Sequence, residues 1–279
     1  MTTTDYEAAP ILGGLYGDGI IALRSAFSTA WADCLREDIE RLFAEAREHP
    51  RCALPRGPQR WYVETQPEQL RGFVDIATHP WFMAVCAHVL GPDYRIVEIG
   101  FDIPLPGAED QPWHRDFPSP EATRIGRRLD SLAFNLTAVD TTPEMGPLEI
   151  APGTQWDDVG EPASADREAG MFPPKALLGR YAARASRRMP QRGDISARSA
   201  LVVHRGTANR SGQARPVLVV GVDGPGAGNA TRHDVQVTGA YHAQLPEAVR
   251  RHLHCRIVDE LKPIEQTHAI DGLVTPQTY

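Results

Sequence analysis

The sequence predicts a mainly β protein with flanking helices and a jelly-roll barrel at its centre. From residue 129 onward, short apolar segments alternate with turns rich in proline and glycine, which is typical of many short antiparallel strands. Segments with the apolar spacing of α-helices precede these strands. The chain has 279 residues, of which 42 % are hydrophobic and 23 % are charged, and this composition fits a sizeable globular core.

The N-terminal part is expected to supply one strand and two helices. Residues 1–12 show no clear pattern and are expected to form a loose leader. A short apolar strand is predicted over residues 20–23. Ser28 is the expected N-cap of a helix over residues 29–48, and a second helix is predicted over residues 80–90. We expect these helices to pack on one face of a sheet.

Strands dominate the middle of the chain. They are predicted over residues 94–103, 129–140, 147–151, 193–197, 200–205 and 215–222. Two stretches depart from this pattern. Residues 50–72, rich in Pro, Gly and Arg, are expected to form a loop, and residues 155–192 a long connection that caps the open end of the barrel.

The expected organisation is a single domain over residues 1–279. Its three parts are a helical and strand N-terminal part (13–92), a jelly-roll core (93–223) and a C-terminal extension (224–279). Within the extension, a helix is predicted from Pro246 to about His254.

Composition limits the partners and the compartment. A net charge of −7 argues against nucleic-acid binding, because phosphate recognition needs clustered Lys and Arg. The four cysteines lack metal-ligand spacing, as expected of reduced thiols. No signal-peptide pattern is seen, and no apolar run approaches the roughly 18 residues of a membrane span. We therefore expect a cytoplasmic protein, monomeric or homodimeric, with a small-molecule substrate and neither a nucleic-acid nor a membrane partner.

A candidate metal site begins in the segment around His114. His114 and Asp116 are two residues apart, so in an extended segment their side chains point to the same face. An imidazole nitrogen and a carboxylate oxygen on one face are two-thirds of the facial triad that binds non-haem Fe(II). His204, at the end of an apolar strand-like run, is the candidate third ligand, and Arg215 is placed to pair with a carboxylate co-substrate. These residues indicate an iron enzyme.

Three blocks of sequence follow one another in a specific order. They are Gln111-Pro-Trp-His114-Arg-Asp116, then Gly146-Pro147-Leu148-Glu149-Ile150-Ala151-Pro152-Gly153-Thr154, and Gly193-Asp194 followed by His204-Arg-Gly206-Thr-Ala-Asn209-Arg-Ser211-Gly-Gln-Ala-Arg215-Pro216. Together they resemble the phytanoyl-CoA dioxygenase (PhyH)-like family of Fe(II)/2-oxoglutarate-dependent oxygenases, over about residues 13–223. One residue departs from the pattern: Gln155 stands where the family often has a histidine, which bears on loop packing and not on the metal.

The resemblance implies a double-stranded β-helix of the cupin type and a dioxygenase that uses Fe(II), 2-oxoglutarate as co-substrate and O2. His114, Asp116 and His204 would be the catalytic metal ligands, and Arg215 would bind the distal carboxylate of 2-oxoglutarate. Related halogenases have a small residue in place of Asp116, so its presence favours hydroxylation or another oxidation over halogenation. Further candidates for the co-substrate pocket are Gln111, Asn135, Thr137 and Ser211.

The expected activity is oxidation, most simply hydroxylation, of a C–H bond of a small metabolite of natural-product metabolism, with release of succinate and CO2. Two alternatives stay open. The same iron could serve desaturation, epimerisation, or endoperoxide or ring formation, and a degenerate site would make the protein a non-catalytic, cupin-like small-molecule binder. Candidate substrate contacts, chosen from their place in the chain, are Trp61, Tyr62, Trp113, Arg115, Phe117 and Trp156.

Overall fold

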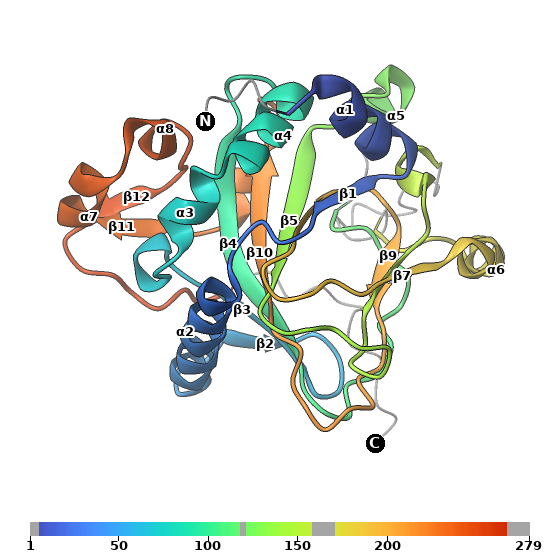
Figure 1. The fold of residues 1–279 in the computed structure, drawn as a ribbon, viewed down its shortest axis with the longest axis horizontal. Helices are drawn as coiled ribbons and strands as arrows, with labels where there is room; N and C mark the ends of the chain where they lie inside the picture. The colour runs from blue at the N-terminus through green and yellow to red at the C-terminus, as the bar shows by residue number, and fades with distance from the viewer. Residues whose placement is uncertain (1–5, 118–120, 158–170, 267–279) are drawn as a thin grey trace.

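The structure, a computed structural model, describes residues 6–117, 121–157 and 171–266. A seven-stranded antiparallel sheet in the order β1-β8-β5-β10-β4-β3-β2 runs through its centre (Figure 1). Its strands are β1 (Ile20–Leu23), β2 (Ala53–Pro55), β3 (Arg60–Glu64), β4 (Arg95–Pro104), β5 (Ser131–Thr137), β8 (Ile195–Ser199) and β10 (Val217–Asp223). The three strands before residue 92 thus extend the same sheet as the jelly-roll strands that follow.

A second, three-stranded sheet completes the jelly roll. Its order is β7-β6-β9, and its strands are β6 (Leu148–Ile150), β7 (Ser186–Arg188) and β9 (His204–Gly206). An isolated antiparallel bridge between His114 and His204 adds the segment around His114 to the free side of β9. The main cavity is lined by residues of both sheets.

Four helices cover the outer face of the large sheet (Figure 1). They are α1 (Ala8–Gly17), α2 (Thr29–Arg47), α3 (Phe73–Ala77) and α4 (Pro80–Leu90). The predicted N-cap is confirmed, because Oγ of Ser28 accepts a hydrogen bond from the Trp31 N–H at 3.1 Å. Leu35, Ile39 and Leu42 recur on one face of α2 and are buried, each side chain contributing about 1.5–3 kcal/mol when removed from water.

Alternation along β5 decides what each face of the sheet meets. Leu132, Phe134 and Leu136 are buried in the core under the helices. Ala133 and Asn135, which point the other way, line the cavity. The helices therefore pack on the outer face of the sheet, and the inner face, which lines the cavity, can carry polar side chains.

Several predicted elements are wrong in type or extent. Residues 8–12 belong to α1 and are no loose leader, because Ile11 and Leu15 are buried in the main core. Residues 50–72 include β2, β3 and the short 3-10 helix η2 (Pro67–Gln69) in place of a loop. The apolar pattern did not predict strand β3, because this strand carries charged and polar side chains on its cavity side, where apolar residues were expected.

Two predicted segments are shorter than expected. Residues 200–203 form a turn, and only His204–Gly206 is a strand, because the chain bends there to hydrogen-bond with residues 151 and 199. The helix after Pro246 ends at Arg250 (α8, Glu247–Arg250), where His252 turns away to stack on Tyr94. The connection over 155–192 contains α6 (Lys175–Arg184) and β7, and residues 158–170 of the predicted cap lie outside the described residues.

The remaining elements frame the ends of the barrel. They are α5 (Glu121–Gly126), η3 (Thr154–Trp156), η4 (Asn229–Arg232), α7 (Gly239–Gln244) and a two-stranded parallel sheet of β11 (Gln236–Thr238) with β12 (Arg256–Val258). Gln155 is fully buried, and its Nε2 donates to the last carbonyls of α1 at 3.0–3.2 Å, so this departure from the family pattern does serve packing. Within the described part of the chain, no helix is both long and apolar enough to cross a membrane.

Candidate active site

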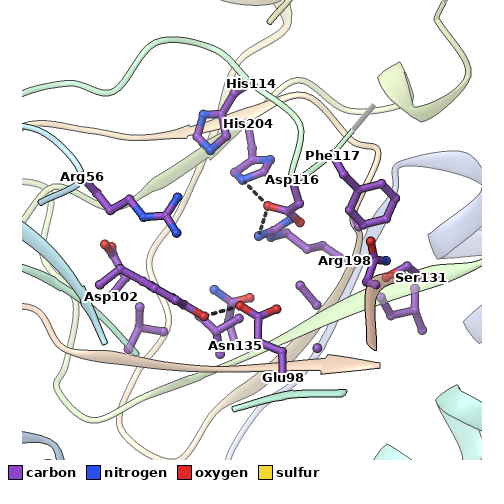
Figure 2. Close-up of a pocket in the computed structure, with 18 of the residues that line it drawn as sticks. Arg56, Glu98, Asp102, His114, Asp116, Phe117, Ser131, Asn135, Arg198 and His204 are labelled. Atoms are coloured by element: carbon purple, nitrogen blue, oxygen red, sulfur yellow. Dashed lines mark hydrogen bonds and ion pairs between the residues drawn. The ribbon is translucent and has the colours of Figure 1, made fainter. Parts of the chain in front are cut away.

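Direct strand pairing brings His114 and His204 together. The N–H of each residue donates to the carbonyl oxygen of the other at 2.9 Å, and the ring centroids are 4.4 Å apart. Asp116, two residues after His114, points to the same side. Potential ligand atoms of the three side chains all lie within 4.8 Å of one another, a spacing that one metal ion can bridge (Figure 2).

The hydrogen bonds around the two imidazoles leave the correct nitrogen free. Nδ1 of His114 lies 2.8 Å from the carbonyl oxygen of Pro112, and Nδ1 of His204 lies 2.9 Å from that of Val202. A carbonyl only accepts, so Nδ1 carries a proton in each ring, and Nε2 is the nitrogen that can bind a metal. Burial, and then the neighbouring His204, lowers the pKa of His114 to about 3, so the His114 ring is neutral near pH 7. The donor set of two imidazoles and a carboxylate fits Fe(II).

Arg198 holds the carboxylate of Asp116, and sequence reasoning missed it. Nη2 of Arg198 donates to Oδ1 at 3.0 Å, and Nη1 donates to Oδ2 (Figure 2). Burial raises the pKa of Asp116, but Arg198 and His204 together lower it further, so the net pKa lies well below its ordinary value. Ile195 and Ala197 belong to the outer core, and alternation along β8 therefore turns Arg198 inward. A single charged residue among the uncharged residues of this strand was the available signal.

Arg215 lies in the cavity as a buried cation with spare hydrogen-bonding capacity. It is 6 % exposed, and its Nε has no hydrogen-bond partner among the described residues. Its Nη2 is 3.8 Å from Oδ2 of Asp102, which also accepts from Nη1 of Arg60 at 2.9 Å. Burial lowers the pKa of Arg215 to about 10, while Asp102 raises it and Arg60 lowers it, so the guanidinium is charged near pH 7. The guanidiniums of Arg215 and Arg60 share the single carboxylate of Asp102, so the three groups carry one net positive charge. That charge can pair with one carboxylate of a ligand.

Two of the four other co-substrate candidates line the same cavity. Oδ1 of Asn135 is buried without a hydrogen-bond partner in the described part of the chain, so it is available to a ligand. Oε1 of Gln111 accepts from the Gly206 N–H at 3.1 Å and fixes that side chain in the cavity wall. Thr137 and Ser211 do not line the cavity. Their hydroxyls donate to Val139 and to Asn209 respectively, within their own loops.

Tyr62 and Phe117 are the two substrate candidates that line the cavity. The hydroxyl of Tyr62 donates to Glu98, and burial, followed by Glu98, raises the pKa of this phenol well above its ordinary value, so it is neutral. Two glycines make room for this pair. A Cβ at Gly100 would come within 2.5 Å of the Tyr62 hydroxyl, and one at Gly221 within 2.7 Å of Oε2 of Glu98. The wall opposite the histidines is therefore polar (Figure 2).

The tryptophan candidates lie elsewhere. Trp61 is on the outer side of β3, close to Phe43 and under Arg47. Trp156 packs near Tyr16, to whose carbonyl oxygen its Nε1 donates at 2.9 Å. Both positions serve packing between elements and do not line the cavity.

Trp113 and Arg115 also point away from the cavity, for the reason that places His114 in it. Alternate residues of an extended segment face opposite sides, so both neighbours of His114 face outward. Trp113 packs in a separate small core with Tyr181. Arg115 is fully buried and donates to the carbonyl oxygens of Thr154 and Asp157, both at 2.7 Å. Arg115 and Trp113 therefore support the loop that carries the histidine.

Comparison with known proteins agrees with this geometry. The sequence pattern of the phytanoyl-CoA dioxygenase (PhyH) family matches residues 15–217. Among solved structures, EctD from S. alaskensis, with 2-oxoglutarate and 5-hydroxyectoine, superposes with a TM-score of 0.61 at 17 % identity over 80 % of this chain and 79 % of that one. The non-haem α-ketoglutarate-dependent carbocyclase SnoK from nogalamycin biosynthesis gives 0.59 at 16 % identity, over 83 % and 91 %. The epimerase SnoN, with Fe3+, α-ketoglutarate and nogalamycin RO, gives 0.56 at 18 % identity, over 78 % and 83 %. At these identities the structural likeness speaks for the fold.

Proposed function

Since this chain belongs to the phytanoyl-CoA dioxygenase (PhyH) family of Fe(II)/2-oxoglutarate-dependent oxygenases, we propose that it hydroxylates a C–H bond of a small-molecule metabolite. The observation that carries the proposal is one cavity that joins two features. A cluster of two histidines and a carboxylate lies on one side of it, and on another lies the buried guanidinium of Arg215, which shares the carboxylate of Asp102 with Arg60. A metal ion and a dicarboxylate fit these two features together.

In this proposal, His114, Asp116 and His204 bind Fe(II) through Nε2, a carboxylate oxygen and Nε2. When bound, Fe(II) supplies, with 2-oxoglutarate and O2, the oxidising power that breaks a C–H bond and yields succinate and CO2. The chain itself contributes position and environment. The Pro112 and Val202 carbonyls orient the imidazoles, so that both Nε2 atoms would face the metal.

Arg215 binds the distal carboxylate of 2-oxoglutarate in this scheme, with Asn135 and Gln111 in the wall beside it. Asp102, which Arg60 holds by a hydrogen bond, lies 3.8 Å from Nη2 of Arg215, so the ligand meets a guanidinium that is already paired on one side. Removing this arginine's charge from water is costly, and the bound carboxylate compensates that cost. The co-substrate would therefore also stabilise the fold.

The metal ligands favour hydroxylation or another oxidation over halogenation. Asp116 provides the carboxylate ligand, and halogenases of related type lack it. Because SnoK is a carbocyclase and SnoN an epimerase, ring formation and epimerisation are the reactions to separate from hydroxylation. Natural-product metabolism as the setting is supported by the same two proteins, and a small polar substrate by the polar wall of Tyr62 and Glu98.

Isotope labelling tests the proposal. The enzyme, loaded with Fe(II) and 2-oxoglutarate, is incubated with fractionated metabolite extracts under isotopically heavy O2, and succinate is quantified beside any new product. Hydroxylation gives one succinate per product and one heavy oxygen atom in that product. Succinate with an unlabelled product contradicts hydroxylation and favours ring formation, desaturation or epimerisation. The variant Arg215→Met, which should bind 2-oxoglutarate poorly, gives the background for both readouts.

A further inference from the structure

Arg198 holds the carboxylate of Asp116 with both arms of its guanidinium. Nη2 donates to Oδ1 at 3.0 Å, while Nη1 donates to Oδ2. Arg198 is 6 % exposed and belongs to β8, which is paired on both sides in the large sheet, so a strand and not a loop sets its position. A planar fork fixed in this way resists rotation of the carboxylate that it binds.

The two oxygens of Asp116 have different surroundings. Oδ1 lies 3.4 Å from Nε2 of His204, the nitrogen that is left free for a metal. Oδ2 makes the shortest contact with Arg198 (Figure 2). A carboxylate oxygen has two lone pairs, so Oδ1 can accept from Arg198 and still offer one lone pair to a metal. Oδ2 accepts from Nη1 of Arg198, and it is Oδ1 that faces Nε2 of His204.

We propose that Arg198 is a positioning residue that restricts Asp116 to coordination through one oxygen. The inference rests on the proposed function, because it takes the cluster of His114, Asp116 and His204 as the metal site. Carboxylates bind metal ions through one oxygen or through both. A second oxygen on the metal would occupy a place that 2-oxoglutarate requires, and Arg198 keeps that place open.

Charge balance alone does not account for an arginine at this position. A bound dication already compensates the charge of Asp116, and a guanidinium beside it is repelled by it. Arg198 therefore costs metal affinity through its charge. The two-pronged geometry of Arg198 fixes the orientation of the Asp116 carboxylate, which a neutral side chain would not do.

The test uses Mn(II), which needs no protection from oxidation, and the full-length protein. Arg198→Met removes both donors at similar length, and Arg198→Lys keeps the charge with one nitrogen. Arg187→Met is the matched control, because Arg187 also pairs with a carboxylate, Glu149, but is half exposed and does not line the cavity. Calorimetry measures Mn(II) binding to the metal-free proteins and then 2-oxoglutarate binding to each protein with and without Mn(II). Crystal structures of the Mn(II) forms measure the two Asp116 oxygen-to-metal distances.

In Arg198→Met we expect Mn(II) affinity to be kept or raised, and 2-oxoglutarate affinity of the Mn(II) form to fall about tenfold. The crystal structures should show one Asp116 oxygen on Mn(II) in the wild type and both in the variant. Arg198→Lys should show the same pattern more weakly, and it carries the test where Arg198→Met does not fold. Arg187→Met should match the wild type.

Three results overturn the inference. Weakened Mn(II) binding with unchanged 2-oxoglutarate binding would make Arg198 a general support of the site. An equal loss of 2-oxoglutarate affinity without metal would make it a direct ligand of the co-substrate. One-oxygen coordination in Arg198→Met would show that the arginine does not set it. Failure of the proposed function looks different, because the wild type itself would then bind no Mn(II).

Discussion

His114 and His204 face each other across an antiparallel bridge, and the N–H of each donates to the carbonyl oxygen of the other at 2.9 Å. Directly opposed residues of such a pair project to the same side, with their Cβ atoms only about 5 Å apart. Backbone pairing thus places the two imidazoles side by side.

Replacing one of these histidines should abolish metal binding while leaving the fold intact. His204→Gln removes a ligand, so we expect the affinity for Mn(II) to fall by about 100-fold or more, measured by calorimetry. The control is His252→Gln, since His252 is also buried and its Nδ1 also contacts a carbonyl oxygen, that of Tyr94 at 2.9 Å, but it belongs to the C-terminal extension. Equal losses in both variants would show that the effect is one of folding.

Arg215→Lys should weaken 2-oxoglutarate binding although it keeps the positive charge. A lysine offers one compact ammonium where the guanidinium offers a rigid fork, and hydrogen bonds to charged groups contribute about 1.5–3 kcal/mol. We expect the dissociation constant for 2-oxoglutarate to rise roughly tenfold or more, in calorimetry with the Mn(II) form. Arg71→Lys is the control, because Arg71 is an exposed arginine that pairs with Glu37 and with the buried Asp38 and does not line the cavity. Unchanged affinity in Arg215→Lys would place the co-substrate elsewhere.

The stability of the metal-free protein should decrease in acid partly through His114. Burial is the main reason that its folded-state pKa is about 3, against an ordinary value of 6.5. Between these values the unfolded chain binds a proton that the folded protein does not, so the free energy of unfolding falls as the pH drops from 6.5 towards 3. Burial also lowers the pKa of His252 and of His79, which adds in the same direction.

Urea unfolding at several pH values, with chelator present, measures this dependence. His114→Gln has no proton to take up, so its free energy of unfolding should fall less steeply over the same pH window than that of the wild type. Parallel curves for the two proteins would mean that the pKa of His114 in the folded protein is close to its ordinary value of 6.5. Such a result would remove one reason for assigning it as a metal ligand.

Two glycine substitutions should change stability in opposite directions. Gly146 has a φ of +72°, and a Cβ there would lie 2.4 Å from the backbone oxygen of Thr207, so Gly146→Ala should cost about 1–3 kcal/mol. Gly179 lies exposed inside α6, where an added Cβ would meet nothing within 4 Å, and Gly179→Ala should stabilise the protein by up to about 1 kcal/mol. Thermal unfolding measures both. A stabilising Gly146→Ala would contradict the close approach of the two loops.

Much of the fold follows from local pattern. The helix over Thr29–Arg47 could be predicted because its apolar residues recur at helical spacing after a serine cap, and the helix over Pro80–Leu90 because Pro begins it and Gly-Pro ends it. Strand β3 could not be predicted in this way, because its cavity face carries Arg60 and Glu64 where apolar residues were expected. Helix α1 could not be predicted either, since its formation depends on the packing of Ile11 and Leu15 in the core and not on local helix propensity.

The residues of the candidate site also fall into those that the sequence could predict and those that it could not. His114 and Asp116 could be assigned because their spacing alone puts them on one face, and the order of the later motifs added His204 and Arg215. Arg198 and Asp102 were missed, because their roles depend on which strands are neighbours in the sheet, and a single sequence does not contain that information. Trp113 and Arg115 were placed in the cavity although strict alternation about His114 turns both away from it.

Binding of Fe(II) and 2-oxoglutarate in one cavity is tested most directly by an anaerobic titration. The metal-free protein is titrated with Fe(II) and then with 2-oxoglutarate, and the visible absorption is followed. The proposed site predicts a weak metal-to-ligand charge-transfer band that appears only when both are present. The band should be lost in His114→Ala and in Arg215→Met, and kept in His252→Gln. Binding of Fe(II) without any band on addition of 2-oxoglutarate would contradict the assignment of Arg215 as the co-substrate anchor, and with it the account of this cavity.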